Sequence, residues 1–127
     1  MDSVVHFEIP ADDTNRAKDF YAKAFGWQLN DWENSGYFLV GTTPSDQNGT
    51  PTSPGSINGG LGKRTGPLSV PTVTLKVDDI DAKLDMIKKL GGSVVGQKSA
   101  VGNIGWSAYF KDTEGNVIGL WQSAQKM

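Results

Sequence analysis

The stretch VDDIDAKLDMIKKLGG, residues 77–92, carries a complete signal for one helix and both of its ends. The Asp78-Asp79 pair offers side-chain oxygens that can cap the first turn, and Gly91-Gly92 is a typical helix end. Apolar residues recur between these ends at helical spacing and share one face: Ile80, Leu84, Ile87 and Leu90. We therefore expect an amphipathic helix here that covers one face of a sheet.

Strand-like segments surround this helix. TVTLKV, residues 72–77, precedes it and alternates, with Val73, Leu75 and Val77 on one face. Three further segments follow the helix, the last two joined by a DTEG turn: SVVGQ at 93–97, WSAYF at 106–110 and NVIGLWQ at 116–122. The second half of the chain therefore predicts the order β-α-β-β-β.

The first half repeats this plan. VVHFEIP, residues 4–10, alternates, with His6 and Glu8 on the face opposite Phe7. A helix is expected after the capping residues 12–14, and Gly26 closes it. Its apolar residues are Ala17, Phe20, Tyr21, Ala24 and Phe25. The strand-like pieces that follow are residues 27–29, 37–40 and 57–61.

The two halves align along their whole length, because Phe25-Gly26 falls on Leu90-Gly91 and His6 falls on Thr72. A unit of this size is too small to close its own core, so the modules, about 1–62 and about 70–124, should pack together. We expect one domain over residues 1–127 with an α+β fold. In it, two βαβββ modules form one incompletely closed barrel around a cup, and the sheet face opposite each helix lines the cup.

The composition excludes several classes of function. The chain of 127 residues has a formal net charge of −2, and its basic residues are scattered, which argues against nucleic-acid binding. No apolar run approaches the roughly 20 residues that a membrane span needs, and no secretory leader is visible. With no cysteine, the chain has no disulfides and no zinc-thiolate sites. We expect a cytoplasmic protein without a nucleic-acid or membrane partner.

The element order, together with FYAKAFGW at 20–27 and FKDTEGNVIGLWQ at 110–122, resembles the vicinal oxygen chelate superfamily. This superfamily contains glyoxalases, bleomycin resistance proteins and dioxygenases, and the resemblance is to its glyoxalase-like, lactoylglutathione lyase-related branch. It covers nearly the whole chain except the loop 43–56 and the last few residues. The resemblance implies the paired-module fold, but this fold hosts many unrelated activities.

In metal-using members of that superfamily, each module contributes one ligand from its first strand and one from its last. Carried onto this sequence, the first strands offer His6 and Thr72, and the last strands offer Gly60 and Gly119, where relatives carry Glu. Glycine has no side chain to donate, and a threonine hydroxyl is a poor ligand for divalent ions. We therefore expect no metal ion and no other cofactor.

His6, the only histidine of the chain, leaves three interpretations open. It lies about 6.5–7 Å along the strand from Glu8, so the pair could form part of a rearranged metal site, although no third ligand is obvious. The carboxylate could instead orient the imidazole for acid–base catalysis. Alternatively, the two side chains are held in structural hydrogen bonds.

The expected cup face supplies further candidate contacts. Trp121 shares the parity of Gly119, and Trp106 should lie near the rim, where aromatic walls suit flat or apolar ligands. Either Trp121 fills the space left by Gly119, or that space admits a ligand. Trp27 and Trp32 are expected in core or interface packing. The candidate substrate-binding residues are His6, Glu8, Thr72, Thr74, Trp106 and Trp121.

Three functional hypotheses follow, and the sequence does not specify the small-molecule ligand. The first is a glyoxalase-like protein that binds a small organic molecule without catalysis. The second is a metal-free isomerase or lyase with His6 and Glu8 as catalytic residues, and the third is a divalent-metal glyoxalase-type lyase. Open sheet edges favour a homodimer, against a monomer whose loop 43–56 shields an edge. That loop is either a lid or a disordered surface segment.

Overall fold

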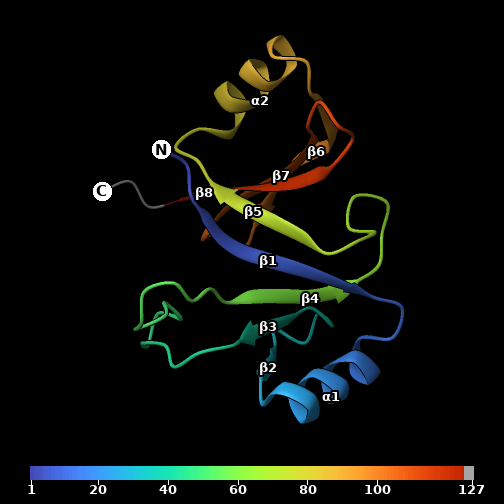
Figure 1. Cartoon of the computed structure of the whole chain (residues 1–127), viewed down its shortest axis with the longest axis vertical. Coiled ribbons are helices and arrows are strands. Elements are labelled where there is room, and N and C mark those ends of the chain that lie inside the picture. The colour runs from blue at the N-terminus through green and yellow to red at the C-terminus, as the bar shows by residue number, and fades with distance from the viewer. Residues whose placement is uncertain (125–127) are drawn as a thin grey trace. The chain divides into compact units, whose positions relative to one another are not determined.

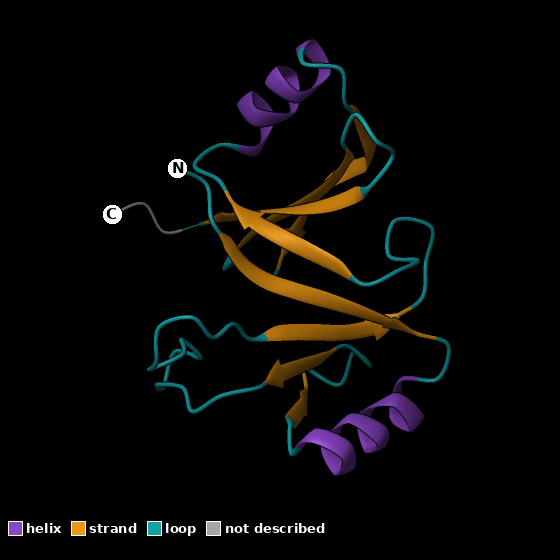
Figure 2. Cartoon of the chain, viewed as in Figure 1, coloured by secondary structure: helices purple, strands orange, loops and turns teal. Residues whose placement is uncertain are grey.

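The computed structural model describes residues 1–124 and divides into two compact units. We call His6–Pro71 the first module, and Met1–Val5 together with the residues from Thr72 onward the second module. Each module contains one helix and a small sheet, so the α+β class and the repeated βαβββ plan are confirmed (Figures 1 and 2).

The first module follows the expected order. Its elements are β1 (Val4–Ala11), α1 (Thr14–Phe25), β2 (Gln28–Asp31), β3 (Phe38–Gly41) and β4 (Gly59–Lys63). The first two residues of β1 belong to the second module. The strand order is β2-β3-β4-β1, in which β1 and β4 are parallel and the other neighbours are antiparallel.

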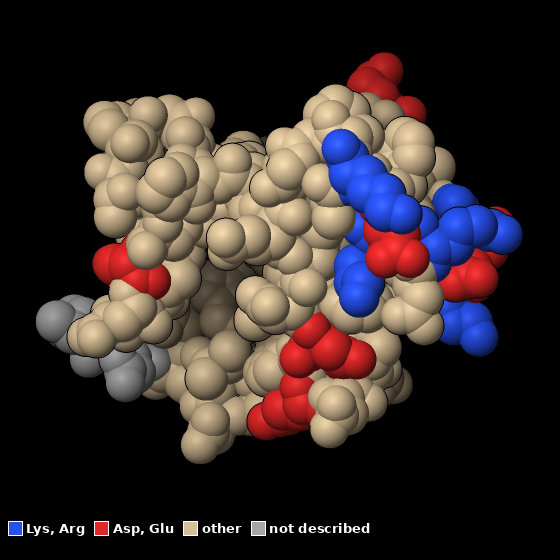
Figure 3. All heavy atoms as spheres, turned by 90° about the horizontal axis from the view of Figure 1, so that it is seen from below, with Lys and Arg blue, Asp and Glu red and all other residues tan. Residues whose placement is uncertain are grey.

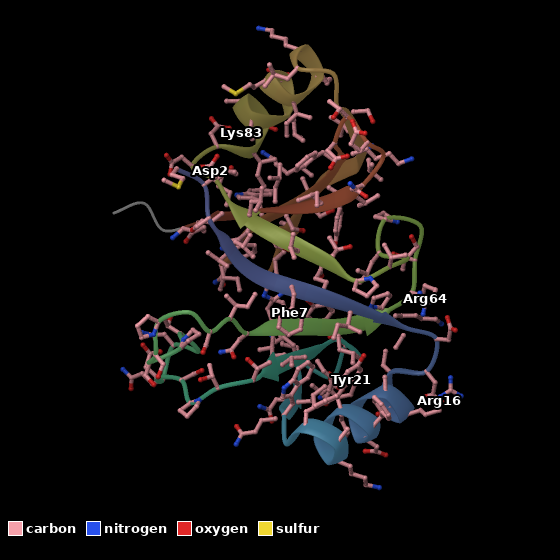
Figure 4. All side chains as sticks on the ribbon, in the orientation of Figure 1. Asp2, Phe7, Arg16, Tyr21, Arg64 and Lys83 are labelled. Atoms are coloured by element: carbon pink, nitrogen blue, oxygen red, sulfur yellow. The ribbon has the colours of Figure 1, made fainter. Side chains whose placement is uncertain are left out.

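The second module repeats this topology. Its elements are β5 (Thr72–Lys76), α2 (Ile80–Lys89), β6 (Ser93–Val101), β7 (Gly105–Lys111) and β8 (Val117–Ser123). The strand order is β5-β8-β7-β6, and again the first and last strands of the module are parallel. The N-terminal residues are held here by an ion pair between Asp2 and Lys83 at 2.9 Å (Figure 4).

Both helices begin as the sequence predicts. The Asp13 side chain accepts the N–H of Arg16 at 3.0 Å, and the Asp79 side chain accepts the N–H of Ala82 at 3.1 Å. At the end of α1, Gly26 has a φ of 73°, the left-handed conformation expected of a closing glycine. Among residues 1–124, no helix is long and apolar enough to cross a membrane.

Each helix packs on one face of its own sheet. The second module buries the expected α2 residues Ile80 and Leu84 against Val77, Ala108 and Leu120. In the first module, however, α1 has no buried residue, and the exposed fractions of Phe20 and Phe25 are 59% and 62%. The strands supply most of that core, in which Ala17, Tyr21 and Trp27 only pack against buried residues. Of the apolar residues that recur at helical spacing in α1, Phe20 and Phe25 therefore stay largely in water.

Two tight turns of the chain have the same hydrogen-bonding pattern, in which an aspartate side chain accepts the N–H groups two and four residues later. In DTEGN, the Asp112 side chain accepts the N–H groups of Glu114 and Asn116, and these bonds, with the Asn116 amide, lower the pKa of Asp112. In DQNGT, the Asp46 side chain accepts the N–H groups of Asn48 and Thr50. This second turn lies in the loop 43–56.

The loop 43–56 is tied to the strand that follows it. The Asn58 side chain donates to the Ser45 hydroxyl at 2.8 Å and to the Gly49 carbonyl at 3.1 Å, and it accepts the N–H of Thr42 at 2.9 Å. The side-chain amide of Asn58, just after the loop, therefore contacts Thr42 just before it, and Ser45 and Gly49 within it.

Candidate functional site

The polar face of β1 lies opposite the core of the first module. Phe7 and Ile9 pack against the buried cluster that also contacts α1, with Phe7 next to Trp27 at 5.8 Å between ring centroids (Figure 4). His6 and Glu8, which alternate with them, project to the other face of the sheet. The strand parity expected from VVHFEIP is confirmed.

Tyr37 joins His6 and Glu8 on this face. Its hydroxyl donates a hydrogen bond to Glu8 Oε2 at 3.0 Å and lies 3.3 Å from His6 Nε2. A phenol has one proton to donate, so its oxygen is the acceptor toward the imidazole. The geometry therefore assigns the proton of neutral His6 to Nε2, which donates to Tyr37.

Burial and charge act on His6 in opposite directions. Partial burial lowers the pKa of the imidazole, and the neighbouring Glu8 carboxylate opposes this by favouring the charged form. Burial is the larger effect, so the pKa lies below the ordinary value of 6.5. His6 is consequently neutral at pH 7.

Two glycines of β4 provide the space for the Tyr37 ring. Gly60, which pairs with Glu8 in the parallel β1–β4 register, lies directly under the phenol, and a β-carbon at this position would overlap the Tyr37 hydroxyl. A β-carbon at Gly62 would lie 2.8 Å from Tyr37 Cδ2. Both glycines are needed for the observed position of Tyr37, because real β-carbons do not make such short contacts.

The second module has a corresponding arrangement. Gly119 pairs with Thr74 in the parallel β5–β8 register, and a β-carbon at Gly119 would lie 2.7 Å from Thr74 Oγ1. Thr72 and Thr74 are both buried, with exposed fractions of 4% and 6%. A hydroxyl oxygen thus lies close above the last-strand glycine in each module.

The two candidate tryptophans lie on opposite faces of their sheet. Trp121 shares the face of Gly119 and places its ring over Gly105, where a β-carbon would lie 2.6 Å from the indole, so it does not fill the space at Gly119. Trp106 alternates to the α2 side. There the Lys98 ammonium lies 4.8 Å from its ring centroid and pairs with Asp81 of α2 at 2.8 Å. The structure therefore separates Trp106 from the other candidate contacts of the second module.

The side chains present do not fit a metal ion. Of the four positions where metal-using relatives carry ligands, only His6 has a good donor, and Tyr37 fills the space at Gly60. Among residues 1–124, no group of three or more His, Cys, Asp or Glu side chains is close enough to hold an ion. The rearranged site built on His6 and Glu8 also lacks a third ligand.

A second feature lies at the junction of β1 and α1. A hollow of about 360 Å³ is lined by apolar residues that include Ile9 and Phe20, and by Arg16 and Arg64 (Figure 4). Arg64 pairs with Asp12 at 2.9 Å, and Asp12 and Asp13 also line the hollow. On the face seen in Figure 3, Lys and Arg side chains gather toward the side that carries α1. The mixed charges of the hollow give it no preference for one class of ligand.

Comparison with known proteins identifies the family. The sequence profile of the Glyoxalase/Bleomycin resistance protein/Dioxygenase superfamily matches residues 3–120. The chain belongs to this superfamily. A glyoxylase-like domain-containing protein of Didymella fabae is 34% identical over 114 residues, which cover 86% of this chain and 84% of that protein. A protein of Mycobacterium bovis is 26% identical over 125 residues, but the chain spans only 44% of its length.

Solved structures support the same fold. Methylmalonyl-CoA epimerase from Mycobacterium tuberculosis superposes with a TM-score of 0.62 at 19% identity, covering 96% of this chain and 88% of the epimerase. A glyoxalase superfamily member from Vibrio splendidus gives a TM-score of 0.59 at 15% identity and covers 97% of this chain and 99% of that one. At such identities the likeness concerns the fold alone.

Sequence reasoning missed Tyr37 as a site residue, although a signal was present. In YFLV, alternation places Tyr37 on the face opposite the buried Phe38. Gly60 and Gly62 share one face of the next strand and leave room there for a ring. A large polar aromatic residue facing two alternate glycines on a paired strand is the pattern that points to Tyr37.

Proposed function

We propose that this protein binds a small organic molecule without a metal ion, and that the first module contacts it through His6, Glu8 and Tyr37. The observation that carries the proposal is the hydrogen-bonded chain Glu8–Tyr37–His6. It is supported by the resemblance, which implies that metal-using relatives carry ligands at the positions of His6 and Gly60. Thr72, Thr74 and Trp121 are the corresponding candidate contacts of the second module. A cytoplasmic location remains part of the proposal.

Membership of the superfamily supports a small organic ligand. Among the structural neighbours, one methylmalonyl-CoA epimerase was solved with methylmalonyl-CoA and another with 2-nitronate-propionyl-CoA. Those ligands belong to those enzymes, and they indicate for this chain only that the fold accommodates molecules of this kind. The identity of the ligand is left to experiment.

A second candidate function is metal-free proton transfer, as in an isomerase or lyase. It is favoured by three titratable side chains in one hydrogen-bonded chain, with an imidazole that burial keeps neutral and therefore able to accept a proton. In this function His6 would take a proton from a carbon acid and return it, and Glu8 would stabilise the imidazolium formed in between. Tyr37 would keep the two side chains in register.

Thermal-shift measurements in EDTA test the binding proposal. The probes are methylmalonyl-CoA, glutathione, catechol, fosfomycin and bleomycin, each titrated against wild type, His6→Gln and Tyr37→Phe. We expect at least one probe to raise the Tm of wild type and to do so less in both variants. The matched control is Phe25→Ala, whose side chain is 62% exposed on α1 and should leave the shift unchanged. A parallel series without EDTA adds zinc or nickel instead of the probes. A Tm that responds to either ion in a His6-dependent way, and to no probe, would contradict the proposal.

Hydrogen exchange distinguishes binding from proton transfer. Methylmalonyl-CoA incubated with the protein in D2O and EDTA is followed by proton NMR. Catalysed exchange of the carbon-bound proton that disappears in His6→Gln would support catalysis. The protein could instead bind methylmalonyl-CoA while the proton exchanges no faster than in buffer alone. That result would support the binding function and contradict catalysis on this substrate.

A further inference from the structure

We propose that Tyr37 determines the specificity of this site: its side chain takes the place of the liganding carboxylate that metal-using relatives carry at position 60, and thereby excludes a metal ion from His6. The inference rests on the proposed metal-free function and names the residue responsible for it. It also limits the class of chemical group that the first module can hold.

The first step is steric. The Tyr37 hydroxyl occupies the position that a β-carbon at residue 60 would need, so no side chain at that position is compatible with Tyr37 as it lies. The ring also lies beside Gly62, where a β-carbon would be 2.8 Å from Tyr37 Cδ2. The loss of the ligand at position 60 and the position of Tyr37 are therefore one coupled feature.

The second step concerns hydrogen bonding. Nε2 of His6 carries a proton directed at Tyr37, and Glu8 Oε2 accepts the Tyr37 hydroxyl proton. An ion coordinated through Nε2 would have to displace both this proton and the phenol, and it would then find no carboxylate at position 60. The imidazole and the carboxylate already have polar contacts without a metal ion.

The second module also places a side-chain hydroxyl close to the glycine of its last strand. Thr74 Oγ1 would lie 2.7 Å from a β-carbon at Gly119, which is the other last-strand position where relatives carry a ligand. A hydroxyl oxygen near the missing ligand in both modules makes a chance arrangement around Gly60 less plausible. In each module, a hydroxyl takes the space of a charged carboxylate.

The consequence is a change in ligand class. A bound metal ion is a large local positive charge, so it compensates the charge of an anionic ligand. Here the face presents a carboxylate, a phenol and a neutral imidazole, and Glu8 would repel an anion. The group that meets this face is therefore a neutral hydrogen-bonding one, such as a hydroxyl or an amide.

A cycle of glycine variants tests the steric coupling without any ligand. Circular dichroism monitors the urea unfolding of four proteins: wild type, Gly60→Ala, Tyr37→Ala and the double variant. The effect of Gly60→Ala is thus measured with and without the Tyr37 ring. We expect Gly60→Ala to lower the urea midpoint by on the order of 1 M in wild type and by much less when Tyr37 is absent. Equal losses in both backgrounds would overturn the inference.

Two further glycines serve as controls in the same strands. A β-carbon at Gly41 would make only ordinary contacts of 3.7 Å, so Gly41→Ala should be tolerated in both backgrounds. A β-carbon at Gly59 would lie 2.5 Å from the Phe7 carbonyl oxygen, so Gly59→Ala should be equally harmful in both. Of these three substitutions, Gly60→Ala alone should depend on Tyr37.

Metal titration tests the exclusion itself. Zinc and nickel are titrated by calorimetry into wild type, Gly60→Glu, and Tyr37→Ala combined with Gly60→Glu. We expect at least tenfold tighter binding in the combined variant than in either other protein, and loss of the gain when His6→Ala is added. No gain in a folded combined variant would overturn the role of Tyr37. If that variant does not fold, the glycine cycle decides. His6-dependent metal binding by wild type would overturn the proposed function as well.

Discussion

The Tyr37 hydroxyl lies where the β-carbon of any side chain at position 60 would have to be, so Tyr37 and Gly60 fit together only as a pair. The same hydroxyl links the carboxylate of Glu8 to the imidazole of His6. A phenol therefore stands at the centre of this group of three side chains. The proton positions in this small network are therefore its most direct test.

The chain offers an unusually clear measurement of those positions, because His6 is its only histidine. We expect nitrogen NMR of the imidazole at pH 8 to show the Nε2–H tautomer, since Nε2 donates to the Tyr37 oxygen. In Tyr37→Phe this preference should weaken, because the acceptor is gone. A dominant Nδ1–H tautomer in wild type would mean that the proton assignment is wrong.

The lowered pKa of His6 predicts how stability depends on pH. Unfolding restores the pKa to about 6.5, so below this value the unfolded chain binds a proton that the folded chain takes up only at lower pH. The contribution of His6 to the free energy of unfolding should therefore be constant above pH 6.5. It should decrease as the pH falls from 6.5 toward the pKa of His6 in the folded protein. For one proton the slope is at most about 1.4 kcal/mol per pH unit.

Urea unfolding between pH 5 and pH 8 measures this slope, and His6→Gln is the control. The variant lacks the titrating group, so the difference between the two proteins isolates His6 from the carboxylates. A difference that grows in favour of wild type as the pH falls would show that the histidine gains rather than loses protonation on folding. That result would contradict the dominance of burial over the Glu8 charge.

The sequence predicted the elements well where local chemistry decides them. Capping aspartates and closing glycines located both helices, and alternation in VVHFEIP placed His6 and Glu8 on the correct face. Strand ends were less accurate: β6 continues to Val101, past the expected end at residue 97. Its register against β7 shifts between Val95 and Ser99, and such a bulge has no simple alternating pattern.

The site was predicted in part. The sequence alone shows Gly60, Gly119 and Thr72 at three positions where metal-using relatives carry ligands, because this depends only on residue type and position. The absence of a bound metal ion stays a prediction. The role of Tyr37 was not predicted, because it depends on pairing between β3 and β4, in which Phe38 faces Leu61 and Leu39 faces Gly60. The sheet face of Trp106 was not predicted either, since it follows from the β7–β8 register rather than from the position of the residue near a turn.

The exposed aromatic residues of α1 lead to a stability prediction. Leu61 is fully buried in the core of the first module, and Leu61→Ala should cost about 2–5 kcal/mol. Phe25 is 62% exposed, and its ring lies beside those of Phe20, Tyr21 and Trp27. Because most of its surface stays in water, Phe25→Ala should cost less than about 1 kcal/mol. Urea unfolding of both variants checks the difference. Equal losses would mean that α1 buries Phe25 against something more than its own module.

Assembly into a homodimer is the last prediction. Two strands are edges of the sheet order, β2 beside β3 in the first module and β6 beside β7 in the second. Such edges present unpaired backbone groups that a second copy can cover. A two-fold dimer is also the commonest soluble assembly. Light scattering at micromolar concentration should therefore give about 27 kDa, twice the chain mass of 13.6 kDa.

Repeating the measurement at high salt tests whether apolar contacts hold the dimer together. If they do, the mass stays the same, because salt screens only interactions between charges. A mass near 13.6 kDa at every concentration would instead indicate a monomer, in which the loop 43–56 becomes the candidate cover for an open edge.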